Sequence, residues 1–424
     1  MTTDTEPSAI IAPLPVGYKK RFHAMVKPSG AFCNLNCTYC YYLHKQELLH
    51  QPHAPSMSDE MLERHIRQYI EAQTSDEVVF SWQGGEPTLL GLDFFRKVVE
   101  LQTRYKKPFQ RIENDLQTNG TLLDMEWVFF LKQHNFLIGL SCDGPKRLHD
   151  LNRITRGGMP THDKVVAAAR LLQQQGIPAN VLCVVSRDNA KYPLDVYRFL
   201  TRELDMRRLQ FIPCVEPKNF HHVAPQHWDA DRLPVVGTQQ AKPCAPNSVV
   251  TDWSVDPEDW GSFLCKIWDF WFSRDYGKKY VDLFETVVAQ SLGLPAQKCV
   301  TAEFCGKGLA MEHNGEVFAC DHYVYPEYRI GNIQTTHWRE IAYSKTQQQF
   351  GFAKRDTLPA YCRNQCPHLN LCWGECPKNR LVRCPQGEAG LNYLCPGLKK
   401  FYVHIQRDLP EILRRVKRQK KMLA

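Results

Sequence analysis

Three cysteines near the start of the chain, Cys33, Cys37 and Cys40, have the spacing C-x3-C-x2-C. Each iron of a cubane iron–sulfur cluster needs a soft ligand such as a cysteine thiolate. A loop this short can supply three of the four ligands, which leaves one iron open to a small molecule. The alternative is a zinc site that takes its fourth ligand from elsewhere. Bacterial ferredoxins have a shorter first gap, so the spacing argues against a plain electron carrier.

With Tyr39 directly before the third cysteine, this motif resembles the signature of radical S-adenosylmethionine (SAM) enzymes. The resemblance implies that the three cysteines hold a [4Fe-4S] cluster whose open iron binds SAM. One electron would cleave SAM to methionine and a 5′-deoxyadenosyl radical, which removes a hydrogen atom from the substrate. Tyr39 would pack against the adenine of SAM.

The composition is that of a soluble globular protein, with 43% hydrophobic and 23% charged residues among 424. No apolar run is long enough to span a membrane. The formal net charge is +8. A cluster of basic residues near the C-terminal end supplies six of these charges: Arg414, Arg415, Lys417, Arg418, Lys420 and Lys421. We interpret them as a solvated helix end, with neither a nucleic acid nor a membrane as partner.

Seventeen cysteines are unusual for a chain of this length. The first 20 residues carry acidic side chains and prolines where a signal peptide would carry basic and apolar ones. The chain is also too large to need disulfides for stability. The cysteines therefore predict metal binding in a cytoplasmic protein.

Apolar strand patterns alternate with helical patterns through the first half of the chain, which predicts parallel βα units. The expected strands are 22–27, 77–82, 111–116, 136–140, 179–185 and 209–213. The expected helices are 58–71, 92–105, 124–133, 161–174 and 189–203. Six units favour an α/β fold, a partial (β/α)6 barrel of the radical SAM type, with chemistry at the C-terminal strand ends. A doubly wound sheet is the alternative.

The domain organisation follows from these patterns and from the cysteines. We expect a disordered tail over 1–20, the radical SAM partial barrel over 21–250, and a linker with a packing helix over 251–295. A small cysteine-rich domain would cover 296–397, and a terminal helix with a basic tail would cover 398–424.

Polar loops, at 84–87, 117–120 and 141–145, follow three of the expected strands. Gly84-Gly85-Glu86 resembles the motif with which the family holds the SAM amino group through backbone carbonyls, and glycine permits that close approach. By the same resemblance, Ser141 and Arg153 would contact the ribose and the methionine carboxylate. Ordinary hydrogen bonding within loops is the alternative for these two side chains.

A second group of cysteines follows residue 298, in a segment that glycines and prolines interrupt. We expect metal, rather than an apolar core, to hold this segment together. It resembles the SPASM-type extension of peptide-modifying radical SAM enzymes. The resemblance assigns one [4Fe-4S] cluster to Cys299, Cys305, Cys320 and Cys376. It assigns another to Cys362, Cys366, Cys372 and Cys395.

Two departures from the family pattern stand out. The gap between Cys362 and Cys366 is one residue longer than usual, so that loop must bulge. Cys384 competes with Cys395 as the last ligand, and the run ending at Cys395 fits the pattern better. Scaffolding by zinc ribbons is the alternative for the whole segment.

The segment around Cys320 narrows the resemblance to anaerobic sulfatase-maturating enzymes. In that family the residue matching Asp321 is the proposed base, and Tyr42 and Gln83 match positions near the substrate. These enzymes oxidise a Cys or Ser side chain of a sulfatase to Cα-formylglycine. The resemblance thus implies three [4Fe-4S] clusters, SAM, an unfolded or nascent sulfatase polypeptide as substrate, and an electron donor such as flavodoxin or ferredoxin.

Two other functions stay open at this point. One is a radical SAM/SPASM peptide maturase that forms crosslinks in another target. The other is a non-catalytic iron–sulfur or zinc scaffold that uses its basic end to bind a partner.

Overall fold

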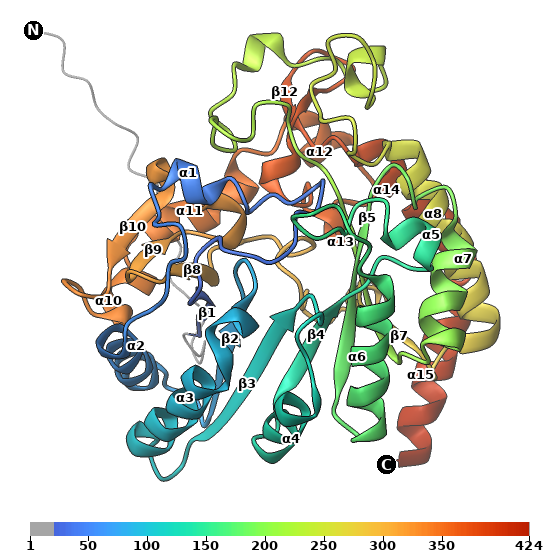
Figure 1. The fold of residues 1–424 in the computed structure, drawn as a ribbon. Coiled ribbons are helices and arrows are strands. Elements are labelled where there is room, and N and C mark those ends of the chain that lie inside the picture. Colours follow the sequence, from blue (N-terminus) through green and yellow to red (C-terminus); the bar gives the residue numbers. More distant parts are fainter. Residues whose placement is uncertain (1–20, 424) are drawn as a thin grey trace, which may run out of the picture.

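The computed structural model describes residues 21–423, with side chains to residue 416, so the expected tail 1–20 lies outside the described residues. One ten-stranded sheet organises the fold, in the order β10-β9-β8-β1-β2-β3-β4-β5-β6-β7 (Figure 1). A two-stranded sheet pairs β11 with β12. The strands are β1 (His23–Lys27), β2 (Glu77–Trp82), β3 (Arg111–Thr118), β4 (Leu137–Ser141), β5 (Ala179–Val185), β6 (Arg208–Pro213), β7 (Tyr280–Val281), β8 (Gly308–Glu312), β9 (Glu316–Phe318), β10 (Arg329–Asn332), β11 (Val382–Arg383) and β12 (Ala389–Leu391).

Helices α2, α3, α4 and α6 lie along the outer side of the curved sheet in Figure 1. The helices are α1 (Lys45–Leu48), α2 (Asp59–Ala72), α3 (Gly91–Tyr105), α4 (Met125–Gln133), α5 (Lys146–His149), α6 (His162–Gln174), α7 (Pro193–Arg198), α8 (Pro257–Phe270), α9 (Asp282–Ser291), α10 (Trp338–Ala342), α11 (Lys345–Asp356), α12 (Ala360–Gln365), α13 (Leu369–Cys372), α14 (Cys395–Ile405) and α15 (Leu409–Leu423).

Strands β1 to β6 pair in parallel and in chain order, which confirms the predicted radical SAM type of fold. The start of α2 illustrates the local signals, because the Ser58 side chain accepts a hydrogen bond from Met61 N. The helix expected over 189–203 begins only at Pro193, since a residue before proline is driven out of the α conformation.

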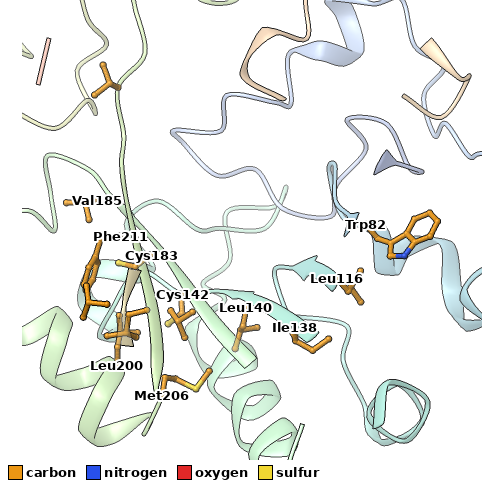
Figure 2. Packing of buried hydrophobic residues seen from close by; sticks show 14 of the residues in the cluster. Trp82, Leu116, Ile138, Leu140, Cys142, Cys183, Val185, Leu200, Met206 and Phe211 are labelled. Carbon is orange, nitrogen blue, oxygen red and sulfur yellow. The ribbon is translucent and has the colours of Figure 1, made fainter. Parts of the chain in front are cut away.

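Apolar side chains from neighbouring strands form the core beneath the site. Figure 2 shows Leu116, Ile138 and Leu140 beside one another, and all three are fully buried. Two cysteines without a predicted ligand role, Cys142 and Cys183, are buried in the same cluster. They therefore act as small apolar side chains in this core.

The segment after residue 307 contributes to the main sheet, which the sequence analysis did not predict. Strand β8 pairs in parallel with β1, and β9 pairs with β8 as a hairpin. Leu309, Met311 and Val317 are fully buried. The expectation that this segment has little apolar core was thus wrong for β8 and β9. The pairing also places the end of β8 beside the start of the three-cysteine loop.

Helix α8 packs closely on α14, and both cover the side of the sheet near β6 and β7 (Figure 1). A Cβ atom added at Gly397 would lie 2.0 Å from the carbonyl oxygen of Pro257, so only glycine permits this approach. The connection 214–256 contains only short turns of helix and isolated bridges. Within the described residues, no helix is long and apolar enough to cross a membrane.

His65 in α2 links the pH to the stability of this fold. Trp338 Nε1 donates to His65 Nδ1 at 3.1 Å, and burial lowers the pKa of the imidazole to about 3. Below pH 6.5 the unfolded chain binds a proton that the folded chain excludes, so folding loses about 1.4 kcal/mol per pH unit through this residue. We expect the melting-temperature gap between wild type and His65→Gln to narrow as the pH falls from 7.5 to 5. A constant gap would contradict this role.

Candidate active site

The three-cysteine loop leaves the C-terminal end of β1 and lies against the Gly84-Gly85-Glu86 loop. Gly85 N donates to the carbonyl oxygen of Gly30, and Glu86 N donates to that of Phe32, both at 2.9 Å. Gly84 has a φ angle of +127°, which favours glycine. The two loops therefore form one backbone-paired unit at the end of the sheet, as a site that binds SAM between them requires.

Gly85 offers a direct test of that pairing. A Cβ atom there would lie 2.0 Å from the carbonyl oxygen of Phe32, so Gly85→Ala must displace the cysteine loop. We expect the variant to release 5′-deoxyadenosine from SAM at least about tenfold more slowly, since small misplacement of reacting groups is costly. Gly157→Ala is the matched control, because Gly157, like Gly85, has no positive φ angle, and the nearest atom to a Cβ there would be Thr155 Oγ1 at 3.9 Å. Equal rates for both variants would contradict the role of the pairing.

The Glu86 carboxylate is buried and directed into the protein. Its Oε1 accepts hydrogen bonds from Thr88 Oγ1 at 2.6 Å and from Thr118 Oγ1 at 2.8 Å. Its Oε2 accepts one from Asn119 N at 2.7 Å. The carboxylate thus joins the ends of β2 and β3, and a contact to SAM from this residue would have to come from its backbone.

A buried ion pair lies on the other side of the cysteine loop. Arg153 Nε donates to Asp143 Oδ2 at 2.9 Å, and the Tyr39 hydroxyl donates to the same oxygen. Asp143 follows Ser141, the last residue of β4, by two positions. The structure therefore brings the predicted SAM contacts Tyr39, Ser141 and Arg153 to one strand end.

The thiols of this loop have the chemistry that a cluster requires. Burial is the largest cause that raises the pKa of Cys33 and of Cys37 to about 12, and Glu86, Cys37 and Cys40 contribute to the rise at Cys33. The Arg153 charge lowers the pKa of Cys37 and of Cys40 in part. Three close thiolates in such a place need a compensating cation, which iron would supply.

Asp321 lies where the cysteine loop meets the segment after β9. The Tyr41 hydroxyl donates to Asp321 Oδ2 at 2.5 Å, and Lys27 forms an ion pair with Oδ1. Burial on its own would raise the pKa of this carboxyl group, but the Lys27 charge lowers it below its usual value. Asp321 is therefore ionised at neutral pH, the form that accepts a proton.

Tyr42 and Gln83, the predicted substrate residues, differ in their surroundings. Tyr42 is buried, and its hydroxyl donates to Glu312 Oε1 at the end of β8. The Lys27 ammonium lies 4.7 Å from the centre of the Tyr42 ring. Gln83 is half-buried directly after β2, and its backbone N donates to the carbonyl oxygen of Val26 at 2.8 Å.

The cysteines of the first auxiliary set lie close enough for their charges to raise one another's pKa. Burial raises the pKa of Cys320, and Cys376 and Cys299 raise it further. Burial likewise raises the pKa of Cys305, to about 11, and Cys299 contributes. The ammonium of buried Lys354 donates to the carbonyl oxygen of Val300 at 2.9 Å, beside these thiols. These four cysteines thus fit one cluster.

The second auxiliary set lines one pocket. Its lining includes Cys362, Cys366, Cys372 and Cys395. Cys384 is not in this lining; it is fully buried among apolar side chains. Cys366 lies directly after α12, so the longer gap is accommodated by a short helix. The structure therefore favours Cys395 over Cys384 as the last ligand.

Within the described residues, no three His, Cys, Asp or Glu side chains surround a single metal ion. A four-iron cluster is larger than one ion, so its ligands lie around a wider volume than those of zinc. The three cysteine sets have the soft donors that such clusters take.

The sequence analysis missed three polar residues that position the site. Lys27 holds Asp321, Tyr41 donates to Asp321, and Asp143 joins Tyr39 to Arg153. Lys27 had a signal, because it is a charged residue at the end of an apolar strand. Asp143 had a weaker signal, its position two residues after the end of β4.

Comparison with known families and proteins agrees with this geometry. Residues 28–200 match the Radical SAM superfamily, and residues 303–367 match SPASM, an iron–sulfur cluster-binding domain. The chain is 41% identical over 388 residues to a serine-type anaerobic sulfatase-maturating enzyme of Bacteroides thetaiotaomicron, covering 92% of this chain and 90% of that one.

A further curated relative and a solved structure are also similar to this chain. The chain is 31% identical to a cysteine-type enzyme of Clostridium perfringens, covering 93% of this chain and 98% of that one. The solved structure of native anSMEcpe with bound AdoMet and Cp18Cys peptide has a TM-score of 0.78 and 31% identity, covering 93% of this chain and 99% of that one. The chain therefore belongs to the anaerobic sulfatase-maturating enzymes, which are radical SAM enzymes with a SPASM domain.

Proposed function

We propose that this enzyme oxidises a Cys or Ser side chain of a sulfatase to Cα-formylglycine. One observation carries the proposal, the position of Asp321 between two sets of expected cluster ligands. Asp321 accepts a hydrogen bond from Tyr41, which directly follows Cys40 in the chain, and Asp321 itself directly follows Cys320. A side chain that reaches Asp321 therefore lies between the SAM-binding loop and an auxiliary ligand set. An ionised carboxylate in that place can accept the thiol or hydroxyl proton of the target.

The cofactors would be held by the residues described above. Cys33, Cys37 and Cys40 would hold the cluster that binds SAM, and the two auxiliary sets would hold the others. When bound, the clusters and SAM would supply hydrogen-atom removal from carbon and one-electron transfer. The chain's own share of the chemistry is to orient the target, to exclude water and to take the proton at Asp321. Lys27 keeps that carboxylate ionised, and Tyr41 fixes its orientation.

The remaining partners follow from the same reaction. We propose an unfolded or nascent sulfatase polypeptide as substrate and flavodoxin or ferredoxin as electron donor. We place the reaction in the cytoplasm, because the clusters need reduced thiols and all seventeen cysteines are free. The relatives of both target types support the sulfatase over another peptide that would be crosslinked.

Anaerobic co-expression with a sulfatase, in a host without its own maturation enzymes, tests this function. The sulfatase should become active with the wild-type chain and stay inactive with Asp321→Asn. An inactive sulfatase in both cultures, with both proteins present, would contradict the proposal. A non-catalytic scaffold would also leave SAM intact when the purified protein is reduced with dithionite.

A further inference from the structure

A pocket adjoins the Asp321 site on the side of the loop 214–256. Two of its lining residues belong to that site as well: Tyr41, which donates to Asp321, and His322, which follows it. Their rings lie 5.2 Å apart. We call it the Lys45 pocket and define it by Tyr41, Lys45, Glu216, His322, Tyr325 and Lys378.

Two lysines reach this pocket, and one of them is fully paired. The Lys378 ammonium donates to the carbonyl oxygen of Val215 at 2.6 Å and to Glu216 Oε1 at 2.5 Å. Both Lys378 and Glu216 are buried. This ion pair therefore joins the loop 214–256 to the cysteine-rich segment, and Lys378 has its acceptors within the protein.

The other lysine has no such partner. Lys45 is 1% exposed, and among the described residues its ammonium has no hydrogen-bond acceptor. The nitrogen lies 3.0 Å from the centre of the Tyr325 ring, which is held by a hydrogen bond from its hydroxyl to the carbonyl oxygen of Phe220 at 2.5 Å. Burial lowers the pKa of Lys45 to about 6. A buried donor group without an acceptor is unfavourable, so this group gains stability from a ligand that brings an acceptor into the pocket.

We propose that Lys45 binds an acceptor oxygen of the sulfatase polypeptide close to the target residue, and so helps to determine which peptides bind. The inference rests on the proposed function. The pocket shares a wall with the Asp321 site, so a peptide whose target side chain reaches Asp321 has neighbouring residues at the pocket. The acceptor is a main-chain carbonyl or a side-chain carboxylate of that peptide, since both accept from an ammonium group.

Peptide binding to the cluster-loaded, SAM-bound enzyme under anaerobic conditions tests this inference. The probe is a fluorescent sulfatase peptide that the wild-type enzyme converts, with the Kd read by anisotropy. Lys45→Met keeps the side-chain length but removes the donors, so its Kd should rise at least about tenfold. Lys45→Arg keeps donors, but on a longer and planar group, so its Kd should rise less than that of Lys45→Met.

The matched control is Lys218→Met, which makes the same substitution at an exposed position of the neighbouring loop. It should leave the Kd unchanged. SAM cleavage without peptide should be the same in all variants. A peptide without acidic residues separates the two acceptors: if the Lys45→Met effect persists, the acceptor is a main-chain carbonyl, and if it vanishes, it is a carboxylate.

The outcomes separate this inference from the function itself. If the wild type converts the peptide but Lys45→Met binds it as tightly as wild type, Lys45 is a packing residue only and the inference fails. If the wild type converts no sulfatase peptide, both fail. Should Lys45→Met not fold, Lys45→Leu replaces it, because this smaller apolar side chain fits the same space and also removes the donors. Its Kd must then rise at least about tenfold, and an unchanged Kd would overturn the inference.

Discussion

Asp321→Asn should reduce formylglycine formation by about 10²–10⁴-fold, the usual contribution of a general base. The amide keeps the shape of the side chain and still accepts from Tyr41, but it cannot take a proton. Cleavage of SAM should continue, because the three cysteine ligands and the loop of Gly84 and Gly85 are untouched. The expected result is thus 5′-deoxyadenosine without aldehyde, measured by chromatography and mass spectrometry on the same samples.

The control for this variant is Asp275→Asn, which neutralises a buried carboxylate away from the site. Asp275 accepts from Tyr197 at 3.0 Å and pairs with Arg202, so its loss affects packing only. Its formylglycine yield per cluster-loaded protein should match wild type. A full yield from Asp321→Asn would remove Asp321 as the base.

Cys37→Ala should abolish SAM cleavage. The cluster would be held by three thiolates, and this variant removes one of them. Replacing a residue that hydrogen-bonds to a metal ligand already lowers activity about 10–100-fold, so the loss of a direct ligand should lower it further. We expect 5′-deoxyadenosine release to fall by more than about 10³-fold. Iron should fall from about twelve to about eight atoms per chain, because each cubane holds four.

Cys384→Ala is the control, since Cys384 is fully buried outside the three ligand sets. It should keep all of the iron and cleave SAM at the wild-type rate. Iron loss in this variant would reassign the last auxiliary ligand from Cys395 to Cys384. Unchanged SAM cleavage by Cys37→Ala would remove the three-cysteine loop from the chemistry.

Local patterns in the sequence predicted much of the fold. The expected strands 77–82 and 179–185 match β2 and β5, because short apolar runs between helical patterns are distinctive. The pair Asn314-Gly315, a frequent hairpin turn, lies between β8 and β9, with Gly315 at a φ of +83°. The pairing of β8 with β1 was not predictable in this way, since it joins segments far apart in the chain.

The sequence predicted many of the residues that form the candidate site, but not the contacts between them. The cysteine spacings and Asp321 follow from the sequence motifs. The hydrogen bonds to the Glu86 carboxylate and the ion pair between Lys27 and Asp321 do not follow from the sequence motifs. Each of these contacts depends on which strand ends meet in space. Lys45 shows the same limit: it lies in an ordinary polar run of the sequence, and only its burial without an acceptor marks it.

The account as a whole is tested most directly by incubating the reconstituted enzyme with SAM, dithionite and peptides containing Cys-x-Pro-x-Arg or Ser-x-Pro-x-Arg. We predict a mass loss of about 18 Da from Cys or about 2 Da from Ser, with an aldehyde that hydrazine reagents trap. Consumption of SAM without an aldehyde on either peptide, or a purified protein that carries zinc in place of iron, would contradict it.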